Sequence, residues 1–179
     1  MQSDLVILEA QDGYASIALN RPDKLNALTP TMLSALRAAL EVAVQDSRYR
    51  AILLTGRGRG FCSGKDITPR PAGVPEDPAA KRALELLFNP IVRIITSSEK
   101  PVVCAVNGVA AGAGANIALA CDFVLAGRGA RFIQSFVKIG LVPDCGGTFF
   151  LPVLWVGRGP LAWRSWETAS PAQRPSVSA

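Results

Sequence analysis

The sequence of 179 residues contains no histidine. This absence excludes a Ser-His-Asp or Cys-His catalytic triad and any zinc site built on imidazole. The only cysteines are four widely spaced residues: Cys62, Cys104, Cys121 and Cys145. Because none forms a Cys-x-x-Cys pair, neither a metal site nor a disulfide framework is expected, and buried reduced thiols are the simpler interpretation. Proton transfer must then fall to Asp, Glu, Lys, Tyr or the backbone.

Charge and long apolar runs are also scarce. Charged residues make up 18% of the chain and hydrophobic residues 49%. No apolar run approaches the roughly 18 residues that a membrane span needs. The N-terminus, Met1-Gln2-Ser3-Asp4, does not resemble a signal peptide. The net charge of +5 is not concentrated in a basic block, so we expect a cytoplasmic single domain with neither a nucleic-acid nor a membrane partner.

Strand patterns alternate with helix patterns along the chain. A hairpin is expected around Asp12-Gly13, and a helix is expected to begin at Thr29-Pro30. A Gly- and Pro-rich loop is expected over 56–78 and a helix, kinked at Pro90, over 79–97. The remaining expected elements are strands at 51–55, 101–106, 123–126 and 131–133 and a small-residue helix over 113–120. This order predicts an α/β domain whose sheet is covered on both faces.

Three segments contain residues that could support catalysis. Residues 60–67 (GFCSGKDI) and 107–116 (NGVAAGAGAN) are glycine-rich, and 141–148 (LVPDCGGT) contains Asp144. Taken singly, they could be a surface turn, close helix–strand packing and a helix N-cap. The second segment has neither GxxxxGK[ST] nor GxGxxG, which disfavours a phosphate loop. Together, two loops with backbone donors and one carboxylate suit stabilisation of an oxyanion and transfer of a proton.

Four segments carry a family resemblance: RPDKLNAL (21–28), FCSGKDI (61–67), AVNGVAAGAGANIALACD (105–122) and KIGLVPDCGGTFFLP (138–152). In this order and spacing they resemble the crotonase (enoyl-CoA hydratase/isomerase) superfamily. FNPIVR (88–93) and ARFIQSFVKIGLVPD (130–144) are most similar to its isomerases of ring-1,2-epoxyphenylacetyl-CoA in phenylacetate degradation. The resemblance implies an α/β fold of the crotonase type, a spiral of ββα units, here lacking the C-terminal helical part.

The resemblance also implies a substrate and the residues that bind it. The family binds an acyl-CoA thioester, whose carbonyl oxygen would accept hydrogen bonds from the amides of Lys65 and Ala113. The second of these amides would open a helix, whose dipole would assist. The positions that match the family's CoA-binding residues are Lys24, Ala27, Asp66 and Ile67. Coenzyme A is part of the substrate, so no separate cofactor is expected.

The acid–base positions indicate which reaction is expected. The two glutamates of the family's hydratases would fall on Asn116 and Phe136, neither of which can exchange the required proton. Asp144 matches the position where several isomerases of the family keep their carboxylate. We therefore expect an isomerase in which Asp144 moves a proton between carbons. Hydration, or another lyase or hydrolase reaction of the family, is the alternative.

The similarity to the family ends abruptly after Pro152. We expect a crotonase-like core over 1–152 and a divergent, disordered tail over 153–179. The sudden loss of pattern suggests a reading-frame slip or a truncated gene product. Family members form homotrimers or hexamers, an assembly that the loss of helices would weaken. An inactive remnant that at most binds CoA is therefore a further alternative.

Overall fold

A computed structural model describes residues 5–68 and 82–155 of the chain. It begins with an antiparallel hairpin of β1 (Val6–Gln11) and β2 (Tyr14–Leu19). The turn between them includes Gly13, whose φ of +80° lies in the region that glycine adopts without steric cost. The hairpin expected at Asp12-Gly13 is confirmed.

The 3-10 helix η1 (Pro22–Lys24) leads to helix α1 (Pro30–Gln45), which begins as expected. The hydroxyl of Thr29 accepts a hydrogen bond of 3.2 Å from the amide of Met32, and Pro30 occupies the first turn. One side of the helix is buried, through Met32, Leu33, Leu36, Ala39, Leu40 and Ala43. Its apolar period therefore predicted the face that packs on the core.

A five-stranded sheet has the order β1-β2-β3-β5-β7. Strands β3 (Ala51–Gly56), β5 (Val102–Val106) and β7 (Phe123–Ala126) continue it in parallel from β2. A second, parallel sheet consists of β4 (Gly60–Cys62), β6 (Val109–Ala111) and β8 (Arg131–Ile133). The expected α/β class is confirmed, but β4 lies inside the expected loop and β6 was missed, because both lie within the glycine-rich segments 60–67 and 107–116.

Within the described residues, the helix expected over 79–97 is divided into two helical segments. A π-helical turn, η2 (Leu84–Phe88), precedes helix α3 (Asn89–Ser97), whose first turn contains Pro90. Proline has no N–H to donate to the preceding turn, so the regular hydrogen-bond ladder is interrupted there. The proline therefore marks the junction of two helical segments.

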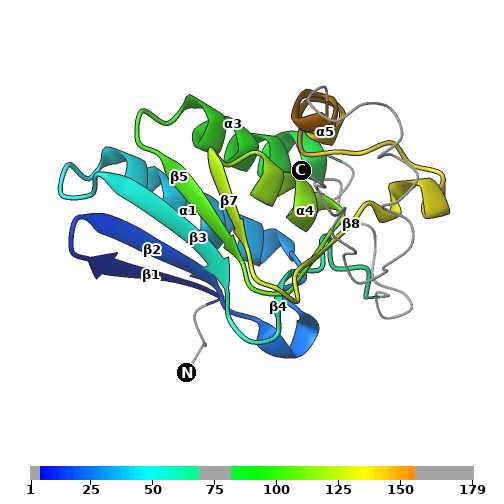
Figure 1. Cartoon of the computed structure of the whole chain (residues 1–179), viewed down its shortest axis with the longest axis horizontal. Coiled ribbons are helices and arrows are strands. Elements are labelled where there is room, and N and C mark those ends of the chain that lie inside the picture. Colours follow the sequence, from blue (N-terminus) through cyan, green and yellow to red (C-terminus); the bar gives the residue numbers. More distant parts are fainter. Residues whose placement is uncertain (1–4, 69–81, 156–179) are drawn as a thin grey trace, which may run out of the picture.

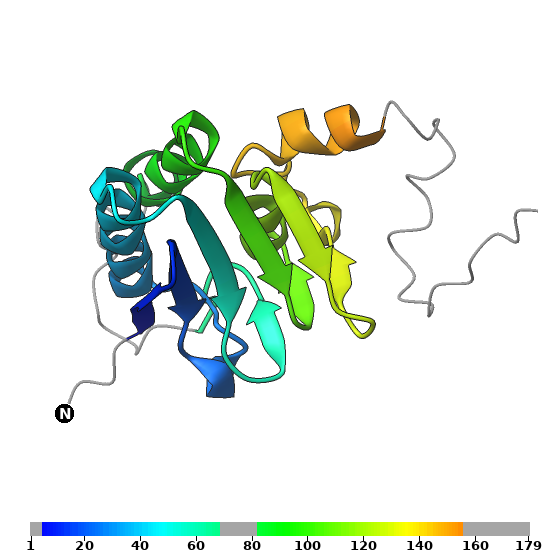
Figure 2. The ribbon, with the colours of Figure 1, turned by 60° about the vertical axis from the view of Figure 1, so that its left-hand side comes forward.

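Helices α1 and α3 lie on the same side of the larger sheet in both views (Figure 1; Figure 2). Ile52, Leu54 and Val102 on that side are at most 1% exposed. On the edge strand β7, Phe123 and Leu125 are 61% and 62% exposed. The expectation that both faces are covered is therefore wrong for the described part of the chain.

The remaining elements lie beside the smaller sheet. They are helix α4 (Ala113–Leu119), the 3-10 helix η3 (Ser135–Ile139) and helix α5 (Gly147–Trp155). Beyond residue 155 the tail expected over 153–179 lies outside the described residues. None of the helices that the structure describes is long and apolar enough to cross a membrane.

Candidate active site

Every residue singled out from the sequence as a candidate site residue lines one open pocket of about 1340 Å³. These residues are Lys24, Ala27, Lys65, Asp66, Ile67, Ala113 and Asp144. They come from the turn after β2, the segment after β4, the start of α4 and the turn before α5. The rest of the lining is mainly small or apolar: Ser63, Gly64, Thr68, Gly112, Ser135, Phe136, Ile139 and Leu141.

The amide of Lys65 faces this pocket because of how its segment pairs with residue 28. Leu28 and Lys65 form a parallel bridge, in which the amide of Leu28 donates to Gly64 O at 2.8 Å and the amide of Asp66 donates to Leu28 O at 3.0 Å. In a parallel pair the residue between two such bonds directs its own N–H the other way. The Lys65 amide therefore points away from Leu28 and donates to no described residue.

The amide of Ala113 is the second free donor. Helix α4 begins at Ala113, and the amide of Asn116 makes its first helical bond, to Gly112 O at 3.1 Å. The first amides of a helix have no partner within it. The Ala113 amide donates to no group in the described part of the chain, and Ala113 lines the same pocket as Lys65.

A glycine with positive φ precedes each of these two amides. Gly64 has a φ of +92° and Gly112 a φ of +50°. A Cβ added to Gly64 would lie 2.8 Å from Ala111 O and 3.6 Å from the amide nitrogen of Ala113. The two loops thus approach each other closely at Gly64, and both free amides belong to residues that line the same pocket.

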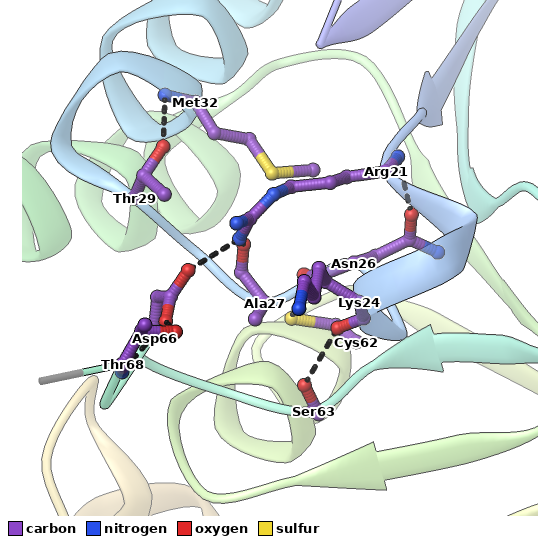
Figure 3. A network of polar contacts seen from close by, with 10 residues as sticks. All are labelled: Arg21, Lys24, Asn26, Ala27, Thr29, Met32, Cys62, Ser63, Asp66 and Thr68. Carbon is purple, nitrogen blue, oxygen red and sulfur yellow. Dashed lines mark hydrogen bonds and ion pairs between the residues drawn. The ribbon is translucent and has the colours of Figure 1, made fainter.

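A polar network fastens the Lys65 segment to the turn after β2 (Figure 3). The guanidinium of Arg21 reaches Asp66 Oδ2 at 2.5 Å and Ala27 O at 3.1 Å. The other oxygen of Asp66 accepts bonds from the amide and hydroxyl of Thr68. These bonds, led by those from Thr68, lower the pKa of Asp66 to about 2. Because its carboxylate already binds Arg21 and Thr68, the Asp66 side chain is not free to bind a ligand in the pocket.

Asn26 fixes the same turn from inside. It is fully buried, and its φ of 55° lies in the left-handed region. Its Nδ2 lies 2.9–3.0 Å from the carbonyl oxygens of Arg57, Gly60 and Phe61, and its Oδ1 accepts from the amide of Arg21 at 2.7 Å. One buried side chain therefore joins η1 to the segment that leads into β4.

Asp144 is half-buried and lines the same pocket. Burial raises the pKa of its carboxyl, while hydrogen bonding to Cys145 and the positive charge of Lys65 oppose that shift. Its Oδ1 is inaccessible to solvent and has no hydrogen-bond partner. Since α5 begins three residues later, at Gly147, Asp144 is not the cap of that helix. The N-cap interpretation of Asp144 is therefore wrong.

Asn116 and Phe136, the positions of the two hydratase glutamates in the resemblance, both lie close to this region. Phe136 lines the pocket and is 7% exposed. Asn116 is fully buried, and its Nδ2 donates to Asp144 O at 2.8 Å. Neither side chain offers a carboxylate, so Asp144 and the ion-paired Asp66 are the only acidic residues that line the described pocket.

The four cysteines are buried and free, as expected. Burial raises the pKa of Cys62 to about 12 and also raises the pKa of Cys145. Such thiols remain protonated at neutral pH, so they are poor nucleophiles beside the pocket.

The sequence interpretation missed the groups that hold the pocket walls in place. Arg21, Asn26 and Gln134 were not singled out, although RPDKLNAL was noted as a family mark. A lone arginine before a proline predicts no partner, and its contact with Asp66 spans 45 positions. Only the folded chain brings such groups together.

The part of the chain that matches known proteins contains all the segments that form the pocket. Residues 9–158 match the family model described as enoyl-CoA hydratase/isomerase. The 1,2-epoxyphenylacetyl-CoA isomerase of Escherichia coli (strain K12) is 44% identical over 151 residues, which are 83% of this chain and 57% of that protein. A "Probable enoyl-CoA hydratase" of Rhodobacter capsulatus is 47% identical over 144 residues, which are 80% of this chain and 54% of that protein.

Solved structures agree on the fold. The crystal structure of an enoyl-CoA hydratase from Thermoplasma volcanium superposes with a TM-score of 0.77 at 35% identity, covering 90% of this chain and 63% of that one. The expected crotonase-type architecture is thereby confirmed. The chain spans a little over half the length of the curated relatives given above.

Proposed function

The chain belongs to the enoyl-CoA hydratase/isomerase family, and we propose that it binds an acyl-CoA thioester and isomerises the acyl group by moving a proton. The observation that carries the proposal is the meeting of two free backbone amides and one half-buried carboxylate in a single pocket. The amides belong to Lys65 and Ala113 and the carboxylate to Asp144. The two amides would stabilise an enolate, and the carboxylate would transfer the proton.

The thioester oxygen is the group that the two amides would hold. When a base removes a proton from a carbon conjugated with the thioester, negative charge moves onto that oxygen. Fixed donors stabilise this charge more than they stabilise the neutral carbonyl, and the loss of one such donor typically costs about 2.7–4 kcal/mol. The close approach of Gly64 to Ala113 supports a shared target for the two amides.

Asp144 would be the base and then the acid. Its carboxylate takes a proton from one carbon, which leaves a dienolate, and the resulting carboxylic acid returns a proton to another carbon of the same conjugated system. Atoms and charge balance without water or an oxidant, and the product has the mass of the substrate. A pKa raised by burial makes the carboxylate a stronger base than an exposed aspartate.

The lining of the pocket is compatible with a CoA ester. Its volume exceeds the roughly 300–1,000 Å³ of a typical small-ligand site, which suits a long ligand. Lys24 and Lys65 contribute positive charge to the lining and form no ion pair within the described residues, so they are available to phosphate. Leu141, Ile139 and Phe136 provide an apolar wall for the acyl group.

Hydration is the competing reaction, because one relative is named a hydratase. Hydration requires two carboxylates that handle water, and the chain has Asn116 and Phe136 at the matching positions. We therefore place isomerisation first. The ring-epoxide of phenylacetyl-CoA belongs among the substrates to be tested, since the named isomerase is 44% identical.

The test is a panel of CoA esters incubated with the purified chain and analysed by mass spectrometry. The panel contains a 2-enoyl, a 3-enoyl and a ring-1,2-epoxyphenylacetyl ester. Isomerisation leaves the mass unchanged in H2O and incorporates deuterium in D2O, whereas hydration adds one water. Asp144→Asn should lower kcat by roughly 10²–10⁴-fold while calorimetry shows acyl-CoA affinity close to that of the parent chain. Near-normal turnover by Asp144→Asn would refute the assignment of the base, and no measurable binding would favour an inactive remnant.

A further inference from the structure

Asn116 is a fully buried polar residue in the middle of the short helix α4. Both polar atoms of its side chain have partners. Nδ2 donates to Asp144 O at 2.8 Å, and Oδ1 accepts from Gln134 Nε2 at 2.8 Å. A buried amide with both ends satisfied holds its neighbours in a defined arrangement.

The bond from Asn116 to Asp144 links two walls of the pocket. Ala113 opens the same helix three residues earlier, while Asp144 belongs to the turn before α5. A Cβ added to Gly147 would lie 2.4 Å from Asn116 Nδ2, so the first residue of α5 packs directly on the amide. The separation between the Ala113 amide and the Asp144 carboxylate therefore depends on this contact.

The turn that carries Asp144 needs such support. Cys145 has a φ of +49° and Gly146 a φ of +75°, so two successive residues are left-handed. A non-glycine residue in that region persists only where its surroundings hold it. The carbonyl of Asp144 also accepts from the amide of Gly147 at 2.8 Å, but that bond lies within the turn itself. Asn116 supplies the bond from outside.

Gln134 binds the oxygen end of the Asn116 amide and supports its orientation. Its Nε2 donates to the oxygen of Asn116, while Asp144 O, which can only accept, takes the NH2 end, so the two contacts select the same orientation. Gln134 lies between β8 and η3 and does not line the pocket. Gln134 thus supports the amide at a distance from the substrate.

We propose that Asn116, oriented by Gln134, is the positioning residue that holds Asp144 at a fixed distance from the oxyanion-binding amide of Ala113. The inference rests on the proposed function and deepens it. In the hydratases of the resemblance, the position of Asn116 holds a catalytic glutamate. In this chain, Asn116 instead supports the turn that carries the Asp144 carboxylate. Asn116 touches no substrate in this arrangement and acts only through Asp144.

The principal test is Asn116→Leu, which keeps the shape of the side chain and removes both hydrogen bonds. A displacement of about 1 Å can lower turnover roughly a hundredfold, so we expect kcat for the isomerised ester to fall by about that factor with KM nearly unchanged. Gln134→Met keeps the length of the glutamine and removes only its hydrogen bond to Asn116 Oδ1. It should therefore lower kcat in the same way but by a smaller factor. If Asn116→Leu fails to fold, Gln134→Met alone decides.

A second readout does not depend on activity. Carbon-13 NMR of the aspartate carboxyls, with Asp144 assigned from its loss in Asp144→Asn, reports the pKa of that group directly. Lys65 and Cys145, the titratable groups that face Asp144, are unchanged in both variants. Release of the turn to solvent should move the pKa of Asp144 down towards the ordinary value of about 3.9.

The matched control is Thr55→Val. Its hydroxyl donates to Ala105 O at 2.9 Å, which is also a partly buried side-chain bond to a distant carbonyl, and Thr55 lies outside the pocket. This variant should change neither kcat nor the Asp144 titration. Unchanged kcat and titration in Asn116→Leu, or equal losses in Thr55→Val, would overturn the proposal. If the parent chain isomerises nothing, the proposed function fails and the titration alone decides whether Asn116 positions Asp144.

Discussion

Gly64 determines where the Lys65 amide points. It combines a φ of +92° with a contact that leaves no room for a Cβ, which would lie 2.8 Å from Ala111 O. Gly112 shares the positive φ, but a Cβ there would lie 3.6 Å from Phe136 and 4.0 Å from Ser135 Oγ, which are ordinary contacts. The first glycine is therefore required by both conformation and space, and the second by conformation alone.

Substitution of Gly64 tests this requirement. Gly64→Ala should displace the Lys65 amide and lower isomerase turnover by roughly 10²–10³-fold, the usual effect of losing one oxyanion donor. Steady-state kinetics with the substrate identified above would measure it. Gly129→Ala is the control, because nothing lies within 4 Å of a Cβ there and its φ is not in the left-handed range. Equal turnover in the two variants would contradict a role for Gly64.

The burial of Asp144 has a consequence for stability. The pKa of Asp144 is raised in the folded state above its value in the unfolded chain. At pH values between these two pKa values, the folded state binds more protons than the unfolded state, so the stability of the fold falls as pH rises through that interval. Asp144→Asn removes the ionisation. We expect the variant to gain unfolding free energy relative to the parent chain as pH rises from about 4 to neutrality, measured by urea denaturation. A difference independent of pH would contradict this account.

At the scale of the element, two short segments behave as one unit. The turn after β2 and the segment after β4 are joined by the Leu28–Lys65 bridge and the Arg21–Asp66 ion pair, and the Asn26 amide ties the same turn to β4. Neither segment is a long helix or strand, so this backbone bridge and the side-chain bonds hold them in place. The position of the Lys65 amide therefore depends on these bonds.

Asp66→Asn probes the network. Its folded pKa of about 2 lies below the unfolded value, so the ionised carboxylate stabilises the fold above that unfolded value, and the contribution is lost as pH falls through about 2. We expect a loss of about 1 kcal/mol at neutral pH for this partly exposed pair and weaker acyl-CoA binding by calorimetry. The stability deficit should shrink in acid.

Asp46→Asn is the matched control for that variant. Asp46 also accepts bonds from an arginine and from the amide two residues on, both belonging to Arg48, but it does not line the pocket. Acyl-CoA affinity should be unchanged in this variant. Equal affinity losses in the two variants would show that the Arg21–Asp66 pair has no special effect on the pocket.

At the scale of the whole molecule, the larger sheet has one buried and one open face. Phe123 and Leu125 project from β7, which ends the five-stranded order, and both are more than half exposed. Apolar side chains on an edge strand favour association between chains. We expect concentration-dependent self-association in sedimentation experiments.

The double variant Phe123→Lys with Leu125→Lys should reduce that association. Charged side chains on an edge strand oppose pairing with another chain. Val42→Lys on α1 provides the control, because Val42 is 50% exposed but lies on a different element. Equal effects of the two changes would mean that overall charge rather than the β7 surface governs association.

The sequence predicted those features that depend on neighbours in the chain. The Asp12-Gly13 turn, the Thr29 cap and the buried face of α1 follow from local conformation and from a period of 3.6 residues. The candidate residues of the pocket came from motifs in a specific order, and the structure gathers all of them. Strands β4 and β6 were missed because both are short and lie within glycine-rich segments.

What the sequence determined alone is the chemistry available: no imidazole, backbone amides in two glycine-rich segments and the carboxylate of Asp144 in a third segment. Tertiary structure decided where these groups meet and what holds them. Arg21 lies 45 positions from Asp66, and Asn116 lies 28 from Asp144. Bonds across such separations leave no period or spacing in the chain, because they depend on the packing of whole elements against one another.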